Sequence, residues 1–130
     1  MQTKLKLVVA VTVGMLVGAV GGWKIHAEQT ATPPGYVVAE VDVHDPEMMA
    51  RYGAKVPETL APFNHHYVIL SGTIQPLEGE PPKGGIVMIA FDSVEKAKEW
   101  YDSPAYAAVR PIRQSAAKSR IFIVEGLPPQ

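Results

Sequence analysis

Three side chains in the C-terminal part of the sequence have types that suit recognition of an organic anion. Tyr106, Arg110 and Arg113 belong to the stretch "EWYDSPAYAAVRPIR" (99–113), and their spacing permits them to converge. An arginine guanidinium can donate two parallel hydrogen bonds to a carboxylate, and a tyrosine adds a rigid aromatic wall that carries a hydroxyl. With Trp100 beside them, these residues are predicted to bind an anionic or aromatic ligand in a cavity between two subunits.

A purely structural interpretation of the same stretch competes with this one. Ser103 suits a helix N-cap and Pro104 suits a first helical position, so Asp102–Ser103 is predicted to join two helical pieces. Pro111 is then expected to end the second piece. On this interpretation the large aromatic side chains fix the joint by burial and bind nothing.

Two acidic residues and one histidine are further candidates. Glu40 projects opposite the valines of a predicted strand, and burial in a dimer would raise its pKa enough for proton transfer. Glu78 lies in the Pro/Gly-rich connection 75–85, which is either a solvated hairpin tip or a loop that closes over a partner's cavity and contributes to ligand binding. His66 is the second weak catalytic candidate beside Glu40.

The His65–His66 pair raises the question of a metal or haem. Adjacent residues on a strand point to opposite faces, and no neighbouring Asp, Glu or Cys completes a standard ligand set. We therefore expect neither a metal nor a cofactor. A nucleophilic serine motif and a phosphate-binding glycine loop are also missing from the sequence, which disfavours a hydrolase or a nucleotide enzyme.

The first 27 residues have the pattern of a secretory signal. Lys4 and Lys6 precede an uncharged run from 7 to 23, and Ala27 is the expected last residue removed. The alternative is an uncleaved inner-membrane anchor, although this run is at the short limit for a membrane span. We expect a periplasmic or secreted protein that contacts a membrane only if the segment is retained.

Composition excludes several kinds of chemistry and of partner. The 130 residues include no cysteine, which excludes disulfides and thiol chemistry. Removal of residues 1–27 leaves nine basic and 13 acidic residues, a net charge of −4, so nucleic acid is not an expected partner. Residues 28–35 form a predicted linker, 36–126 a single domain, and 127–130 a tail.

Hydrophobic periodicity and turn residues predict the order β-α-β-β-α-β. Glu40 and Asp42 alternate with valines in the first strand, Asp45 caps the first helix, and Pro57 is expected to kink or restart it. Gly72 suggests a bulge in the second strand. The predicted strands span 36–43, 67–74, 86–91 and 120–124. This order predicts an α+β, ferredoxin-like protomer with a four-stranded antiparallel sheet and helices on one face.

The second face of that sheet is also apolar. The strand 86–91 carries apolar side chains on both faces, whereas the helices can cover only one of them. A large apolar patch rarely stays exposed in a monomer, so we expect a homodimer, sheet against sheet, that forms an α+β barrel across a two-fold axis.

The chain also resembles a bacterial family catalogued as domain of unknown function 1330, within the dimeric α+β barrel superfamily, over about residues 36–126. The resemblance rests on "DPE" (45–47), Tyr52, "VPETLAPF" (56–63), Gly72, "LEGE" (77–80), "FDSVEKAKEWYDSPAY" (91–106), Arg110, Arg113 and "VEG" (124–126). It implies a ferredoxin-like protomer and a homodimer, and it implies no activity. Asn64, His65 and His66 stand where the family commonly has a Gly-Gly-basic turn.

These observations support three hypotheses about function. The first is an exported dimeric module that binds a small aromatic or anionic molecule at the dimer interface. The second is a cofactor-independent monooxygenase or isomerase that acts on a small metabolite. The third is an interaction protein without a ligand. A perturbed carboxylate or histidine in the cavity favours the enzyme, and a dry apolar cavity favours binding.

Overall fold

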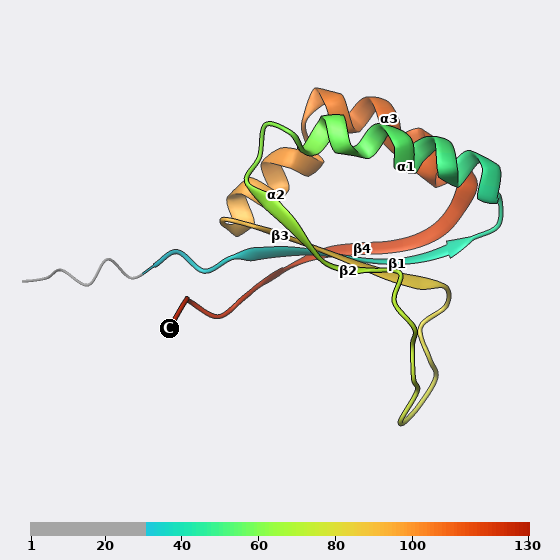
Figure 1. Ribbon diagram of the computed structural model, residues 1–130, viewed down its shortest axis with the longest axis horizontal. Helices are drawn as coiled ribbons and strands as arrows, with labels where there is room; N and C mark the ends of the chain where they lie inside the picture. Colours follow the sequence, from blue (N-terminus) through green and yellow to red (C-terminus); the bar gives the residue numbers. More distant parts are fainter. Residues whose placement is uncertain (1–30) are drawn as a thin grey trace, which may run out of the picture.

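The elements follow the expected order, with the second helical region divided in two (Figure 1). The computed structural model describes residues 31–130, so the predicted signal and most of the predicted linker lie outside the described residues. Within this part of the chain, no helix is long and apolar enough to span a bilayer. The elements are β1 (Gly35–Val43), α1 (Pro46–Leu60), β2 (His65–Leu70), β3 (Gly85–Phe91), α2 (Val94–Tyr101), α3 (Pro104–Ala116) and β4 (Ala117–Glu125).

The four strands form one antiparallel sheet in the order β2-β3-β1-β4. Central β1 pairs with β3 on one side and with β4 on the other, so that Val38 lies opposite both Met88 and Phe122. All three helices cover the same face of this sheet (Figure 1). The predicted ferredoxin-like α+β architecture is therefore confirmed for the protomer.

Short polar residues begin all three helices, as the sequence predicts for Asp45 and Ser103. The side chains of Asp45, Ser93 and Ser103 accept hydrogen bonds from backbone N–H groups three residues later. Each satisfies a donor that the first helical turn leaves without a partner. The joint at Asp102–Ser103 is confirmed, with Pro104 at the start of α3.

The expectation that Pro111 ends its helix was wrong, and Pro57 does not restart the first helix. Pro57 lies inside α1, which continues without a break to Leu60, and Pro111 lies inside α3, which runs on to Ala116. A proline frees the carbonyl four residues earlier, here those of Gly53 and Ala107. Both of these residues are exposed, so water can bind the freed carbonyls and the helices continue.

Strand β2 differs from its prediction in bounds and in alternation. It ends before Gly72, and the register shifts between Tyr67 and Ile69. Tyr67 pairs with Ile89 on the helix side of the sheet, whereas Ile69 pairs with Met88 on the opposite side. The strict alternation expected from the sequence placed Tyr67 and Ile69 on one face, and the irregularity separates them.

The core lies between the sheet and the helices. Phe91 of β3 stacks on Trp100 of α2, with ring centroids 5.5 Å apart, and Trp100 packs in turn on Tyr106 of α3 at 4.1 Å. Close approach also positions β1 against α2, since a Cβ at Gly35 would lie 2.5 Å from the Ser93 carbonyl oxygen. The buried cluster comprises Val37, Val56, Leu60, Ile89, Phe91, Ala97, Trp100, Tyr106 and Val109.

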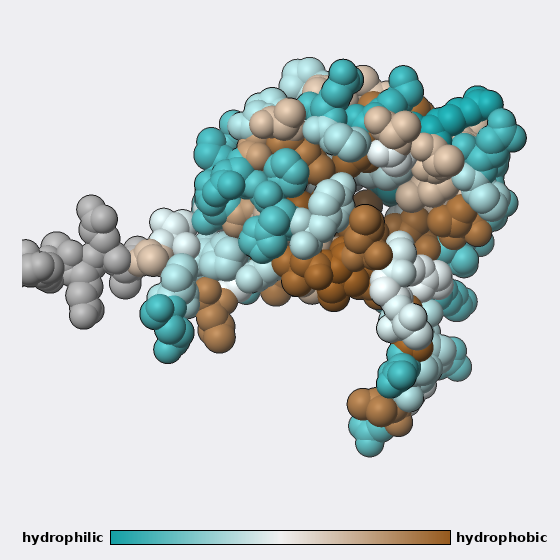
Figure 2. Space-filling model, in the orientation of Figure 1, coloured by the Kyte–Doolittle hydropathy of each residue, from teal (hydrophilic) through white to brown (hydrophobic). Residues whose placement is uncertain are grey.

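The opposite face of the sheet, which we call the free face, is not covered by any described element. Phe122 and Val124 of β4 are 50% and 45% exposed, and both lie opposite apolar residues of β1. Figure 2 shows hydrophobic side chains gathered beneath the helix layer. The β2–β3 connection extends on the side of the sheet away from the helices (Figure 1), and Leu77 within it is 94% exposed.

Candidate functional site

The four residues predicted from the stretch 99–113 lie together between the helices and the sheet. Trp100 and Tyr106 are 2% and 1% exposed, and Trp100 Nε1 donates a hydrogen bond of 3.0 Å to Thr59 Oγ1. This contact satisfies the only polar group of the indole, which makes Trp100 a core residue. None of the four projects from the free face, and their predicted place in a cavity between two subunits stays a prediction.

Arg113 is the most unusual member of this group. It occupies the last turn of α3, is 5% exposed, and forms no ion pair with any carboxylate of residues 31–130. Its Nε is buried without a hydrogen-bond partner in the same part of the chain. Burial acts to lower the pKa of Arg113, but interactions with the Tyr106 and Tyr52 hydroxyls raise it above its ordinary value. The guanidinium is therefore a buried cation without an anion.

The hydroxyls of Tyr52 and Tyr106, from two different helices, act on this cation. The Tyr52 hydroxyl of α1 lies 2.8 Å from the Tyr106 hydroxyl of α3. Burial, and then the neighbouring Tyr106, raise the pKa of Tyr52. Burial and Tyr106 also raise the pKa of Tyr67, which approaches from β2. The Tyr52 and Tyr67 phenols are therefore neutral near pH 7, so they act as hydrogen-bonding groups and not as bases.

Arg110 makes different contacts from Arg113. Its guanidinium carbon lies 4.2 Å from the centroid of the Tyr101 ring and 5.5 Å from that of Tyr106. The same group donates a hydrogen bond to the Tyr101 carbonyl oxygen, while its Nε is buried without a partner among the described residues. Arg110 therefore holds the Tyr101 ring in place through a cation–π contact and a hydrogen bond.

A cavity of about 390 Å³ opens beside Arg113, between α3 and β4, and we call it the α3–β4 cavity. Ser119 contributes from β4, and its Oγ is buried without a partner among residues 31–130. The cavity thus brings together a guanidinium, a hydroxyl and a side-chain amide, which suits an anion. Its lining residues are Tyr101, Arg113, Gln114, Ala117, Ser119 and Ile121.

Sequence analysis did not identify Gln114 and Ser119. The last strand was expected to begin at residue 120, whereas β4 begins at Ala117. Ala117, Ser119 and Ile121 alternate with exposed residues, and this period of two was the available signal. Ser119 would have been placed on the helix side of the sheet if the strand had been started three residues earlier.

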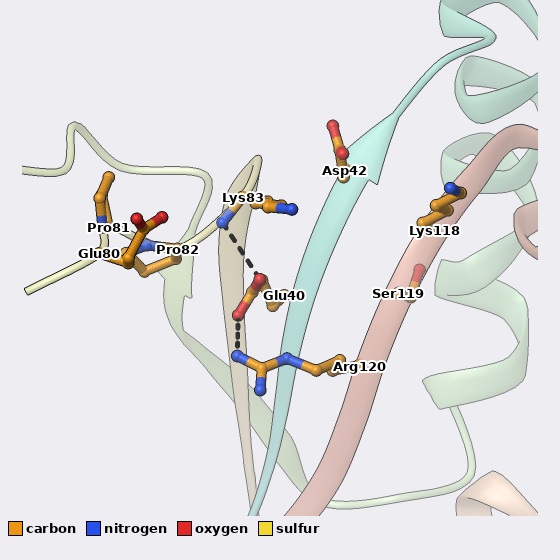
Figure 3. A pocket seen from close by; sticks show the side chains of 9 residues that line it. All are labelled: Glu40, Asp42, Glu80, Pro81, Pro82, Lys83, Lys118, Ser119 and Arg120. Carbon is orange, nitrogen blue, oxygen red and sulfur yellow. Dashed lines mark hydrogen bonds and ion pairs between the residues drawn. The ribbon is translucent and has the colours of Figure 1, made fainter.

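Glu40 belongs to a separate pocket on the free face (Figure 3). Its carboxylate accepts a 3.1 Å hydrogen bond from the Lys83 backbone N–H. It also forms an ion pair with Arg120, in which the nitrogen and oxygen atoms lie 2.5 Å apart. The hydrogen bond from Arg120, followed by that from Lys83, lowers the pKa of Glu40. In this protomer Glu40 is therefore ionised, and it fastens the base of the β2–β3 connection to the sheet. The pocket measures about 560 Å³ and is lined by Glu40, Asp42, Glu80, Pro81, Pro82, Lys83, Lys118, Ser119 and Arg120.

The remaining predicted residues lie apart from the α3–β4 cavity. Glu78 is exposed within the β2–β3 connection. His66 is exposed on the free face opposite Ala90, while His65 Nδ1 lies 2.7 Å from the Phe63 carbonyl oxygen. No group of three His, Cys, Asp or Glu side chains suited to a metal occurs among the residues that the structure describes.

Comparisons with known proteins extend the description of the fold. A search of curated proteins found no match. A protein of unknown function from Rhodopseudomonas palustris is 21% identical with a TM-score of 0.59, covering 75% of this chain and 85% of that one. SnoaB, a cofactor-independent oxygenase from Streptomyces nogalater, is 12% identical with a TM-score of 0.52, covering 75% and 97%. A dimeric ferredoxin-like protein of unknown function from Thermobifida fusca is 14% identical with a TM-score of 0.51, covering 72% and 92%.

These similarities to solved structures concern the fold. A family model, in contrast, matches residues 34–127, which include every described helix and strand. The matched range agrees with the resemblance found in the sequence between residues 36 and 126. The chain therefore belongs to the family described as domain of unknown function (DUF1330).

Proposed function

We propose that this protein binds a small organic anion in the α3–β4 cavity, with Arg113 as the main charge partner of the ligand. The observation that carries the proposal is the 5% exposure of Arg113 combined with the lack of a carboxylate partner in residues 31–130. An unpaired buried cation opposes folding. A bound anion would remove this penalty, because the guanidinium could donate two parallel hydrogen bonds to it.

Binding is better supported than catalysis at this site. Oxygenation or isomerisation without a cofactor requires a group that takes a proton from the substrate. The described lining of the cavity has no carboxylate and no histidine, and burial raises the pKa of the neighbouring Tyr52. The oxygenase activity named for SnoaB therefore remains the second candidate, and the shared fold alone supports it.

We further propose that the protein is an exported homodimer. Half-exposed Phe122 and Val124 make the free face an apolar surface that a second copy could cover, and the Thermobifida fusca neighbour is described as dimeric. Export to the periplasm or beyond rests on the signal pattern of residues 1–27, with retention as an inner-membrane anchor as the alternative.

The ligand proposal can be tested with a panel of small carboxylates. Thermal unfolding of the full chain is measured with each compound, and stabilising compounds are titrated calorimetrically. We expect Arg113→Met to abolish the stabilisation, because it removes the charge and keeps much of the side-chain volume. Arg51→Met is the matched control, since Arg51 is exposed and forms a surface ion pair with Glu47. Stabilisation that persists in Arg113→Met would contradict the proposal.

Export and assembly can be measured together by native mass spectrometry. The protein is expressed with its own N-terminal segment and recovered from the cell envelope. A mass of two chains that begin at Glu28 would support cleavage and the dimer. A monomer that retains residues 1–27 would contradict both.

A further inference from the structure

The α3–β4 cavity is lined by two residues that each carry an unpartnered polar atom, one on the helix and one on the strand. Arg113 Nε comes from the helix and Ser119 Oγ from the strand, and both are buried without a hydrogen-bond partner in residues 31–130. Buried polar groups are normally hydrogen-bonded, so two such atoms on residues that line one cavity favour a ligand that pairs with both side chains.

The chain geometry explains why these two residues line one cavity. Helix α3 ends at Ala116 and β4 begins at Ala117, with no connecting loop between them. Both alanines are buried at this reversal, at 0% and 5% exposure. The last helical turn and the first strand residues therefore become the two walls of the cavity, and the small side chain of Ala117 leaves space between them.

The lining also limits the charge of the ligand. Arg113 is the only charged side chain that lines the described cavity, because the guanidinium of Arg110 is turned onto the Tyr101 ring. One guanidinium matches one carboxylate in charge and in planar shape. A phosphate dianion would require further positive charge or additional donors.

The remaining lining limits the size and polarity of the ligand. A volume of about 390 Å³ lies at the lower end of the range for small-molecule sites. Ser119 and Gln114 place a hydroxyl and an amide beside Arg113, and each of these groups can donate or accept a hydrogen bond. A second oxygen on the ligand, whether hydroxyl or oxo, would find a partner there.

From these steps, and resting on the proposed function, we infer that the ligand is a small monocarboxylate with a hydroxyl or oxo group beside the carboxylate. The Arg113 guanidinium binds the carboxylate, while Ser119 and Gln114 bind the second oxygen. Arg110 is a positioning residue that acts through Tyr101. An aromatic acid without this second oxygen would leave Ser119 Oγ unpaired and would therefore bind less tightly.

The test is an NMR titration of the full chain with a matched pair of ligands. Lactate and propionate differ by one hydroxyl, and benzoate and inorganic phosphate represent the competing classes. We expect lactate to bind about tenfold more tightly than propionate, which is the usual effect of one neutral hydrogen bond. The largest shifts should occur at the amides of Arg113, Gln114 and Ser119.

A conservative variant tests the hydrogen bond to the second oxygen of the ligand. In Ser119→Ala the preference for lactate should fall to within about threefold, while propionate binding stays unchanged. Equal binding of lactate and propionate, or tighter binding of benzoate or phosphate, would overturn the inference while Arg113-dependent anion binding still stood. If none of the four compounds shifts the NMR signals of the wild-type protein, the inference and the proposed function are overturned together.

Discussion

Replacement of Arg113 by methionine should stabilise the free protein while it removes ligand binding. Methionine is apolar and unbranched, so it can fill much of the same space in the core. Loss of the unsatisfied Nε removes a penalty of about 1–3 kcal/mol. Loss of the contact with the tyrosine hydroxyls costs about 1 kcal/mol. Tyr52 and Tyr106 retain each other as partners at 2.8 Å, so the substitution creates no new unpaired phenol.

The expected net gain in the free energy of unfolding is about 1 kcal/mol, the difference between those two effects. In a domain of about 100 residues, a gain of this size raises Tm by about 4–8 °C. Urea unfolding followed by circular dichroism measures the free energy, and a thermal scan measures Tm. Both are recorded without ligand and at constant pH.

The comparison with Arg51→Met makes the measurement specific. Arg51 is exposed and its 2.9 Å pair with Glu47 spans one helical turn, so this substitution should change stability by no more than about 0.5 kcal/mol. If Arg113→Met instead lowers stability by more than about 2 kcal/mol, Arg113 supports the fold through contacts that outweigh its unpaired burial. The reasoning that assigns it to a ligand would then be refuted.

Three further predictions concern other parts of the molecule. Gly35→Ala should lower stability by about 1–3 kcal/mol in urea unfolding, because its Cβ would lie 2.5 Å from the Ser93 carbonyl oxygen and neither backbone segment can move freely. The lowered pKa of Glu40 means that its contribution to stability is present above the unfolded value of 4.5 and is lost as pH falls through the folded pKa. Glu40→Gln should therefore lose less stability than wild type between pH 7 and pH 3, and an identical loss would contradict the role of Arg120. Phe122→Glu should convert the proposed dimer to a monomer in light scattering without loss of secondary structure, since Phe122 is 50% exposed in the protomer.

Elements set by local chemistry were predicted well. Asp45 and Ser103 cap their helices because a short polar side chain reaches the free N–H groups of the first turn, an interaction contained within four residues. The order of strands and helices follows from periodicity, which is also local. The ferredoxin-like arrangement then follows, because this order has few ways to cover one face of a sheet.

Features that depend on the surroundings of a residue were predicted less well. Pro111 was expected to end its helix, yet it lies inside α3, as Pro57 lies inside α1, and both helices continue because the freed carbonyls belong to exposed residues. The bulge in β2 was expected at Gly72 and occurs between Tyr67 and Ile69. Solvent access and pairing with β3 decide these outcomes, and neither can be found in a short segment of sequence.

The candidate site likewise combines features that the sequence predicted with features that depend on the fold. The sequence by itself determined that arginines and tyrosines suited to an anion occur together near the end of the chain, because residue type and spacing are its own properties. Only the tertiary structure decided that Arg113 is buried without a carboxylate partner in residues 31–130 and that Ser119 lines the same cavity. Whether a polar atom has a partner depends on how segments distant in sequence pack around it, and that packing exists only in the folded chain.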